Sequence, residues 1–185
     1  MGDDGGVAAL PVVVVMGVSG VGKSTVGTRL AEALGVPFVD GDDLHTPANR
    51  AKMAAGHPLT DEDRWPWLDA VEAWIDADAA ACCGGVVACS ALKRSYRDVL
   101  RRGGANVWFL HLDAPHDVVE RRMRERRGHQ MPVSLLDSQE AALEPLQPDE
   151  DGVTMPASRK VDRIVRDAVA MLVDVPISEA PSALG

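Results

Sequence analysis

Two stretches near the N-terminus combine residue types suited to phosphate chemistry. The first reads G-V-S-G-V-G-K-S-T and fits the spacing G-x-x-x-x-G-K-[ST]. Its glycines let successive backbone N–H groups point inward at phosphate oxygens. In this pattern the lysine, Lys23, reaches the β- and γ-phosphates, and the hydroxyl of Ser24 ligates Mg²⁺. We therefore predict an ATP site formed by Gly17, Val18, Ser19, Gly20, Val21, Gly22, Lys23, Ser24 and Thr25.

The second stretch, D-G-D-D-L-H, follows an apolar run that is typical of a buried strand. In a doubly wound sheet, ligands lie beyond the carboxyl ends of the strands, so Asp40 and Asp42 would face the phosphate loop. One carboxylate can hold Mg²⁺, and the other can accept a proton from an attacking hydroxyl. Gly41 is expected to leave room for a ligand. For Asp43 the sequence indicates only an exposed position.

The elements that would position these residues follow an alternating pattern. Short apolar runs alternate with stretches of helical period, which is typical of a parallel sheet wrapped by helices and predicts an α/β fold with five strands. The expected strands are Val12–Met16, Val36–Asp40, Val86–Cys89, Val107–Leu112 and Val153–Met155.

Helices are expected between these strands. One contains Val26 to Leu34 and stops at Gly35, and another follows a capping box formed by Thr60 and Asp63. Trp67 and Trp74, in this second helix, are interpreted as core residues. Further helices are predicted at 92–102, 117–127 and 157–173.

Bulk properties restrict the class of protein. A chain of 185 residues with 46% hydrophobic and 25% charged residues fits one domain, which we place at 1–175 with a loose tail at 176–185. The net charge of −9 argues against nucleic-acid binding. The N-terminus resembles no signal peptide, and no apolar run is long enough for a membrane span. With three cysteines interpreted as reduced thiols, we expect a cytoplasmic protein without membrane contact.

The phosphate loop alone does not separate kinases from other nucleotide-binding proteins. The sequence has no N-K-x-D for guanine, which disfavours a GTPase. No expected strand ends in an acidic pair of the D-E kind, which disfavours a motor ATPase; the third is followed by Ser90 rather than by a carboxylate.

A longer set of motifs gives a more specific indication. The phosphate loop and D-G-D-D-L-H are followed by N-R-A-K-M-A-A-G-H-P-L-T-D-E-D-R-W-P-W-L, C-S-A-L-K-R-S-Y-R-D-V-L-R and R-M-R-E-R-R-G-H. Together these resemble gluconokinases of the small P-loop type, which are related to shikimate kinases and nucleoside monophosphate kinases. The resemblance implies a three-layer P-loop NTPase fold with a mobile lid, and ATP-dependent phosphorylation of D-gluconate at its 6-hydroxyl.

The resemblance also implies roles for individual residues near the phosphates. By analogy with shikimate kinases, Asp42 lies nearest the acceptor hydroxyl and Asp40 nearest Mg²⁺. Lys23, Asp42 and Arg126 are the predicted catalytic residues. Arg122 and Arg126 match the family's R-x-x-x-R-x-G-H, whose arginines clamp ATP phosphates from a lid, here expected at about 122–147.

The acceptor end needs a fork for a carboxylate and several hydrogen-bonding groups. Arginine has the geometry for the fork, and Arg64 is the candidate; the alternative is a surface ion pair with Asp61 or Glu62. Spacing adds further candidates, since Lys93 and Arg97 stand at i, i+4. The predicted substrate-binding residues are Asp42, His45, Arg50, Arg64, Lys93, Arg97 and His129.

Two other interpretations stay open at this stage. The first is a kinase of the same fold for another small hydroxylated acid such as shikimate. The second is a nucleotide-binding regulatory protein that has lost phosphoryl transfer. The sequence does not fix the oligomeric state, and a homodimer is one of the options. ATP and Mg²⁺ are the expected cofactors.

Overall fold

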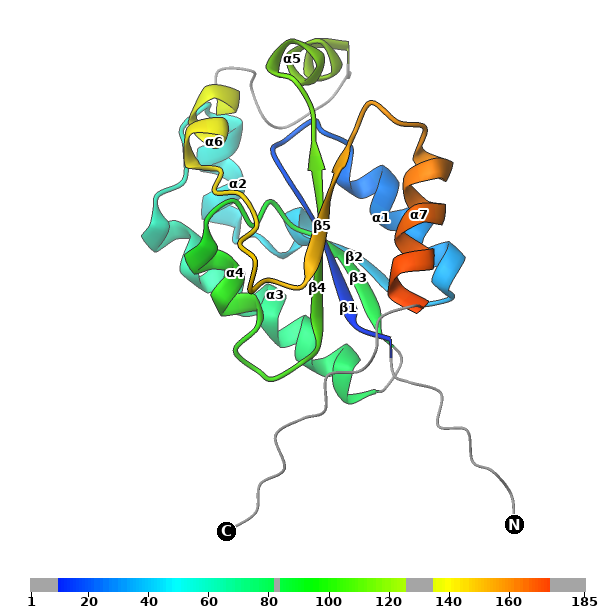
Figure 1. The fold of residues 1–185 in the computed structure, drawn as a ribbon. Coiled ribbons are helices and arrows are strands. Elements are labelled where there is room, and N and C mark those ends of the chain that lie inside the picture. Colours follow the sequence, from blue (N-terminus) through cyan, green and yellow to red (C-terminus); the bar gives the residue numbers. More distant parts are fainter. Residues whose placement is uncertain (1–9, 82–83, 126–134, 174–185) are drawn as a thin grey trace, which may run out of the picture.

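The computed structural model describes residues 10–81, 84–125 and 135–173, and it has a parallel β-sheet at its centre (Figure 1). Five strands lie in the order β2-β3-β1-β4-β5, and all neighbouring pairs are parallel. This confirms the predicted α/β class with a five-stranded parallel sheet. The strands are β1 Val12–Met16, β2 Phe38–Asp40, β3 Gly85–Ala88, β4 Val107–Asp113 and β5 Gly152–Pro156.

Helices cover both faces of the sheet, which makes three layers (Figure 1). Because side chains alternate along a strand, Val13 and Val15 pack toward α1 (Lys23–Leu34) and α7 (Val161–Val173), whereas Val12 and Val14 pack toward α3 (Asp61–Ala80) and α4 (Arg94–Leu100). The helices are α1 Lys23–Leu34, α2 Pro47–Ala54, α3 Asp61–Ala80, α4 Arg94–Leu100, α5 His116–Glu125, α6 Leu136–Ala142 and α7 Val161–Val173.

Local signals set two of these helix ends where the sequence indicates. The Thr60 side chain accepts from the Asp63 N–H, and the Asp63 carboxylate accepts from the Thr60 N–H, so the predicted capping box opens α3. Gly35 ends α1 in the left-handed region at φ 70°, as the sequence predicts. Trp67 is buried in the core, which confirms its interpretation.

The segment after β2 is more structured than the sequence analysis proposed. β2 starts at Phe38 rather than Val36, and a 3-10 helix, η1 (Gly41–Leu44), follows it directly. The unpredicted α2 then begins behind Thr46, whose hydroxyl accepts from the Asn49 N–H. Two short helices therefore fold the chain back toward the phosphate loop.

The structure also bears on the predictions about membrane spans and cysteines. Within the described ranges, no helix is both long and apolar enough to cross a membrane. Cys89 is a buried free thiol, and burial raises its pKa to about 12. Cys82, Cys83 and the predicted tail at 176–185 lie outside the described residues.

Candidate active site

The phosphate loop connects β1 to α1 in a tight curve. Gly17, Gly20 and Gly22 all have positive φ, a conformation that L side chains rarely adopt. At Gly17 a Cβ would also lie 2.6 Å from the Leu112 carbonyl oxygen, so only glycine fits there. α1 begins at Lys23, and the Lys23 ammonium donates to the Val18 carbonyl at 3.0 Å. The loop and the helix N-terminus thus present N–H groups and a cation to one place, which suits an anion.

Asp40 and Ser24 meet beside this loop. The Ser24 hydroxyl donates to Asp40 Oδ2 at 2.5 Å, and the Asp42 N–H donates to Asp40 Oδ1 at 3.1 Å. Two hard oxygen ligands lie next to the phosphate loop, which is the donor chemistry that Mg²⁺ prefers. The residues present therefore fit the predicted cation.

Gly41 has a different role from the one expected. A Cβ on Gly41 would lie 2.7 Å from the Ala88 carbonyl oxygen, and the Trp67 indole N–H donates to the Gly41 carbonyl at 2.7 Å. The absent side chain therefore permits close packing of η1 over β3, and the space goes to the protein rather than to a ligand.

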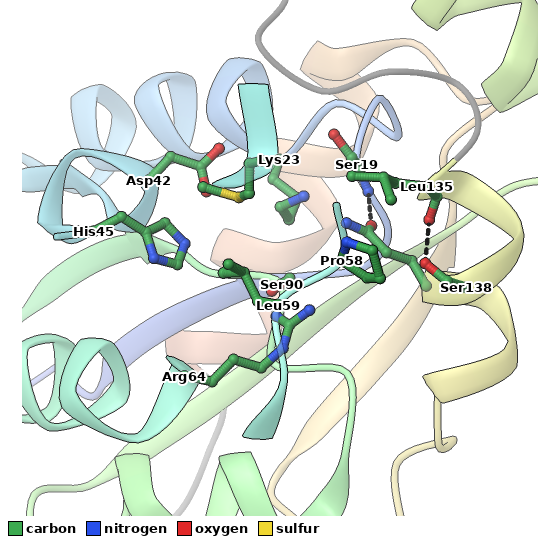
Figure 2. A pocket seen from close by; sticks show the side chains of 12 residues that line it. Ser19, Lys23, Asp42, His45, Pro58, Leu59, Arg64, Ser90, Leu135 and Ser138 are labelled. Carbon is green, nitrogen blue, oxygen red and sulfur yellow. Dashed lines mark hydrogen bonds between the residues drawn. The ribbon is translucent and has the colours of Figure 1, made fainter. Parts of the chain in front are cut away.

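A pocket joins the phosphate loop, η1, α3 and α6 (Figure 2). In the view of Figure 2, Asp42 and Lys23 lie toward the top and Arg64 lies below them. The pocket has a volume of about 30 Å³, which is enough for one or two water molecules. Its walls must therefore separate to admit a larger molecule. The lining residues are Ser19, Lys23, Asp42, His45, Met53, Pro58, Leu59, Arg64, Ser90, Leu135, Ser138 and Gln139.

His45 is a neutral hydrogen-bonding group in this pocket. Its ring stacks on Trp67 with centroids 4.2 Å apart, and its side chain is almost fully buried. Burial, with a smaller effect from the nearby charges of Arg64 and Arg50, lowers the His45 pKa to about 4. Asn49 Nδ2 lies 3.4 Å from His45 Nδ1; an amide that donates there leaves the ring proton on Nε2.

The predicted acceptor-binding residues divide into two groups. Asp42, His45 and Arg64 line the pocket, and the Arg64 guanidinium lies 5.7 Å from the centre of the Tyr96 ring. Lys93 is not among the lining residues, because both oxygens of Asp61 hold its ammonium at 2.9 Å. Asp61 thus pairs with Lys93, and within the described ranges Arg64 forms neither of the alternative ion pairs, with Asp61 or with Glu62.

Arg97 and Arg50 lie elsewhere than the sequence analysis expected. The Arg97 side chain is fully buried, pairs with Glu150 at 2.6 Å and donates to main-chain carbonyls, so it does not reach the pocket. The i, i+4 spacing predicted that Arg97 shares a helix face with Lys93. In the structure the Arg97 side chain instead points from α4 toward the segment before β5. Arg50 is exposed and donates to the carbonyls of His45 and Asp43, which shapes the pocket wall from outside.

α6 supplies a pocket wall that the site prediction missed. The Ser19 N–H of the phosphate loop donates to Gln139 Oε1 at 2.7 Å, and Gln139 is buried. Leu135 and Ser138 line the same side. The sequence offered no local signal for this contact, because 120 residues separate its two partners.

A second, open hollow of about 350 Å³ lies on the other side of the loop. Arg122 spans it, since its guanidinium donates to the Val21 carbonyl at 3.0 Å and to the Ala157 carbonyl at 2.9 Å. Gly22, Thr25 and Arg159 are among its lining residues. A space between the phosphate loop and two arginines suits the remainder of a nucleotide.

The model of the shikimate kinase family matches residues 19–170. A Gluconobacter oxydans protein described as gluconokinase is 46% identical over 156 residues, which is 84% of this chain and 88% of the relative. The chain belongs to the gluconokinase family. Thermosensitive gluconokinase from Escherichia coli is also 46% identical, over 76% of this chain and 75% of the relative.

Solved structures agree with this membership of the gluconokinase family. A gluconokinase from Sinorhizobium meliloti superposes with a TM-score of 0.79 at 46% identity and covers 89% of this chain and 92% of that one. A sugar kinase from Janibacter superposes with a TM-score of 0.83 at 49% identity, and the match covers 87% of this chain and 93% of that one. Shikimate kinase from Aquifex aeolicus, at 15% identity and a TM-score of 0.54, shows the shared fold alone.

Two residues predicted from the gluconokinase motif R-x-x-x-R-x-G-H cannot be placed. Arg126 and His129 lie outside the described residues, as does the stretch 126–134 of the predicted lid at 122–147. The described part of that segment contacts the rest of the domain: the Ser19 N–H donates to Gln139 of α6, and the Glu144 N–H donates to the Leu92 carbonyl at 2.8 Å. The lid and its boundaries remain predictions.

The low pKa of His45 leads to a prediction about acid stability in this gluconokinase-family chain. Between pH 6.5 and about 4 the unfolded chain binds a proton at residue 45 and the folded chain does not, so acid favours unfolding. Replacing His45 by Phe retains the stack on Trp67 and removes this contribution, which amounts to at most about 3 kcal/mol. Urea unfolding at pH 7 and pH 4.5 should show a smaller loss of stability in His45→Phe than in the unaltered protein. An equal loss in both proteins would contradict the assignment.

Proposed function

We propose that this chain transfers the γ-phosphoryl group of ATP to the 6-hydroxyl of D-gluconate, giving 6-phospho-D-gluconate and ADP. One observation carries the proposal: a single pocket is lined by Lys23 of the phosphate loop, by Asp42 and by Arg64. It therefore combines a phosphate-binding cation, a proton acceptor and a carboxylate-binding fork. Gluconate has a hydroxyl at one end and a carboxylate at the other, which matches this set.

The nucleotide would occupy the phosphate loop and the open hollow beside it. Backbone N–H groups of the loop, the N-terminus of α1 and Lys23 would hold the phosphates. Arg122 and Arg159 border the remaining space. When bound, Mg²⁺ would supply positive charge to the phosphates, and Ser24 and Asp40 would hold it.

Asp42 would orient the acceptor hydroxyl and receive its proton as the oxygen attacks. Its carboxylate faces the pocket, and its N–H donates to Asp40. The backbone contact would thus hold the residue in place, and the carboxylate would act on the acceptor. Neutral His45 can hydrogen-bond a sugar hydroxyl, and Arg64 can bind the carboxylate bidentately. Orientation by these residues would supply much of the rate enhancement, because phosphoryl transfer depends on positioning and electrostatics.

Closure of the pocket would exclude water, which otherwise competes with the acceptor for the phosphoryl group. The small volume of the pocket supports a cycle in which α6 and its neighbours move to admit the acid. The lid at 122–147, with Arg126 as a phosphate clamp and His129 at the acceptor, belongs to the same proposal. Cytoplasmic location and a homodimer remain predictions.

The proposed function is tested by an acceptor panel. The purified protein is mixed with ATP, Mg²⁺ and one of D-gluconate, shikimate, glucose or a nucleoside monophosphate, and ADP release is measured. We expect release with gluconate to exceed release with each other acceptor by at least about 100-fold in kcat/KM, because glucose and the nucleotide lack a carboxylate and the ring of shikimate holds its hydroxyls in a different position relative to its carboxylate. Equal or greater turnover of shikimate would contradict the proposal. Tight ATP binding without turnover of any acceptor would favour the regulatory alternative.

A further inference from the structure

Tyr96 lies beneath the arginine that we assign to the acceptor's carboxylate. It is almost fully buried on α4, with Trp65 packed edge-on at 5.6 Å between ring centres. The Arg64 guanidinium carbon lies 5.7 Å from the centre of the Tyr96 ring, and the Lys93 ammonium lies 5.4 Å from it. Two cations therefore lie within cation–π distance of one aromatic ring, whose electron-rich faces attract positive charge.

Asp61 forms an ion pair with Lys93 and not with Arg64, so the two cations have different surroundings. It accepts from the Tyr96 hydroxyl at 2.5 Å and from Lys93 at 2.9 Å, and these bonds hold its pKa below the usual range. The charge of Lys93 is thereby balanced within the protein. In the part of the chain that the structure describes, no carboxylate lies within 4 Å of the Arg64 guanidinium, so its charge stays available toward the pocket.

We propose that Tyr96 is a positioning residue that makes the pocket selective for an anionic acceptor, because its ring holds the Arg64 guanidinium. This inference rests on the proposed function and assigns a residue to its preference for an anionic acceptor. An arginine side chain loses rotamer freedom when it binds a ligand, and a ring that restrains it beforehand reduces that loss. Of the two cations beside the Tyr96 ring, Lys93 is balanced by Asp61, and Arg64 remains for the carboxylate of the acceptor.

The test compares gluconate with gluconamide, which keeps the hydroxyls and lacks the negative charge. KM and kcat are measured for both acceptors, and KM for ATP, in the unaltered protein and in Tyr96→Met and Tyr96→Phe. We expect Tyr96→Met to raise KM for gluconate about tenfold, the size of a partly desolvated cation–π contact, with little change for gluconamide, ATP or kcat. Tyr96→Phe retains the ring and should keep KM for gluconate within about threefold.

Arg64→Leu provides the reference for complete loss of the fork. Combining it with Tyr96→Met should lower the preference for gluconate over gluconamide no further than Arg64→Leu alone, because Tyr96 acts through Arg64. A Tyr96→Met protein that loses activity equally toward both acceptors would overturn the inference and indicate a merely structural role. If Tyr96→Met does not fold, a trifluorinated phenylalanine at position 96 replaces it and is compared with Tyr96→Phe: this ring keeps its shape and loses its electron-rich faces, and an unchanged preference would overturn the inference.

Failure of this inference is distinguishable from failure of the proposed function. If the unaltered protein does not phosphorylate gluconate, the proposed function is contradicted whatever the variants do. If it does so and Tyr96→Met keeps its preference for gluconate over gluconamide, only the role of Tyr96 is contradicted.

Discussion

Replacement of Asp42 by Asn is expected to lower kcat for gluconate by roughly 100-fold or more, the scale of a lost general base. Asparagine keeps the size of the side chain, and the Asp42 N–H that bonds Asp40 is unaffected by the change. The substitution removes the group that receives the acceptor's proton and leaves the phosphate loop intact. Steady-state ADP release measures kcat, and fluorescence titration with an ATP analogue measures nucleotide binding, which should persist.

Asp43→Asn is the matched control for this experiment. It makes the same chemical change one residue away, on an exposed side chain that does not line the pocket. We expect Asp43→Asn to retain near-normal turnover. Near-normal turnover in Asp42→Asn, or an equal loss in both variants, would exclude Asp42 as the proton acceptor.

Replacement of Arg97 by Met is expected to reduce the free energy of unfolding by about 3–5 kcal/mol, the usual cost of leaving a buried charge without its partner. Arg97 and Glu150 have no exposed side-chain surface and lie 2.6 Å apart. Burial alone would raise the Glu150 pKa, but bonds from Arg97 and from the Gln147 N–H keep it below its usual value. Chemical denaturation at pH 7 measures the loss.

Two variants show whether the buried charge is responsible. Arg102→Met removes an exposed arginine just after α4 that pairs with Asp69, and exposed pairs of this kind contribute little to stability. Adding Glu150→Gln to Arg97→Met removes the stranded carboxylate and should restore part of the lost stability. If Arg97→Met costs no more than Arg102→Met, the pair of Arg97 and Glu150 does not anchor the segment before β5.

The sequence indicated the parts of the fold that depend on neighbouring residues. The phosphate loop, the capping box at Thr60 and the stop at Gly35 are local signals, and the structure has each of them. β1 matches its predicted bounds because five consecutive apolar residues are buried on both faces of a parallel sheet.

Features that depend on distant partners were not predictable in the same way. Arg97 has a spacing to Lys93 that suits a shared helix face, but Glu150, 53 residues later, fixes where its side chain lies. Gly41 is next to carboxylates in the sequence, yet Ala88 of another strand explains the need for glycine. Tyr96 and Gln139 acquire their positions only when α4 and α6 pack near Arg64 and Ser19.

The measurement that bears most directly on the proposed function is the position of the phosphate in the product. The unaltered protein is incubated with ATP, Mg²⁺ and D-gluconate, and the product is examined by proton-coupled phosphorus NMR. A phosphomonoester coupled to the methylene protons of carbon 6, formed in step with ADP, is the predicted result. ADP formed with inorganic phosphate and no phosphorylated sugar acid, or a phosphate on another carbon, would contradict the account.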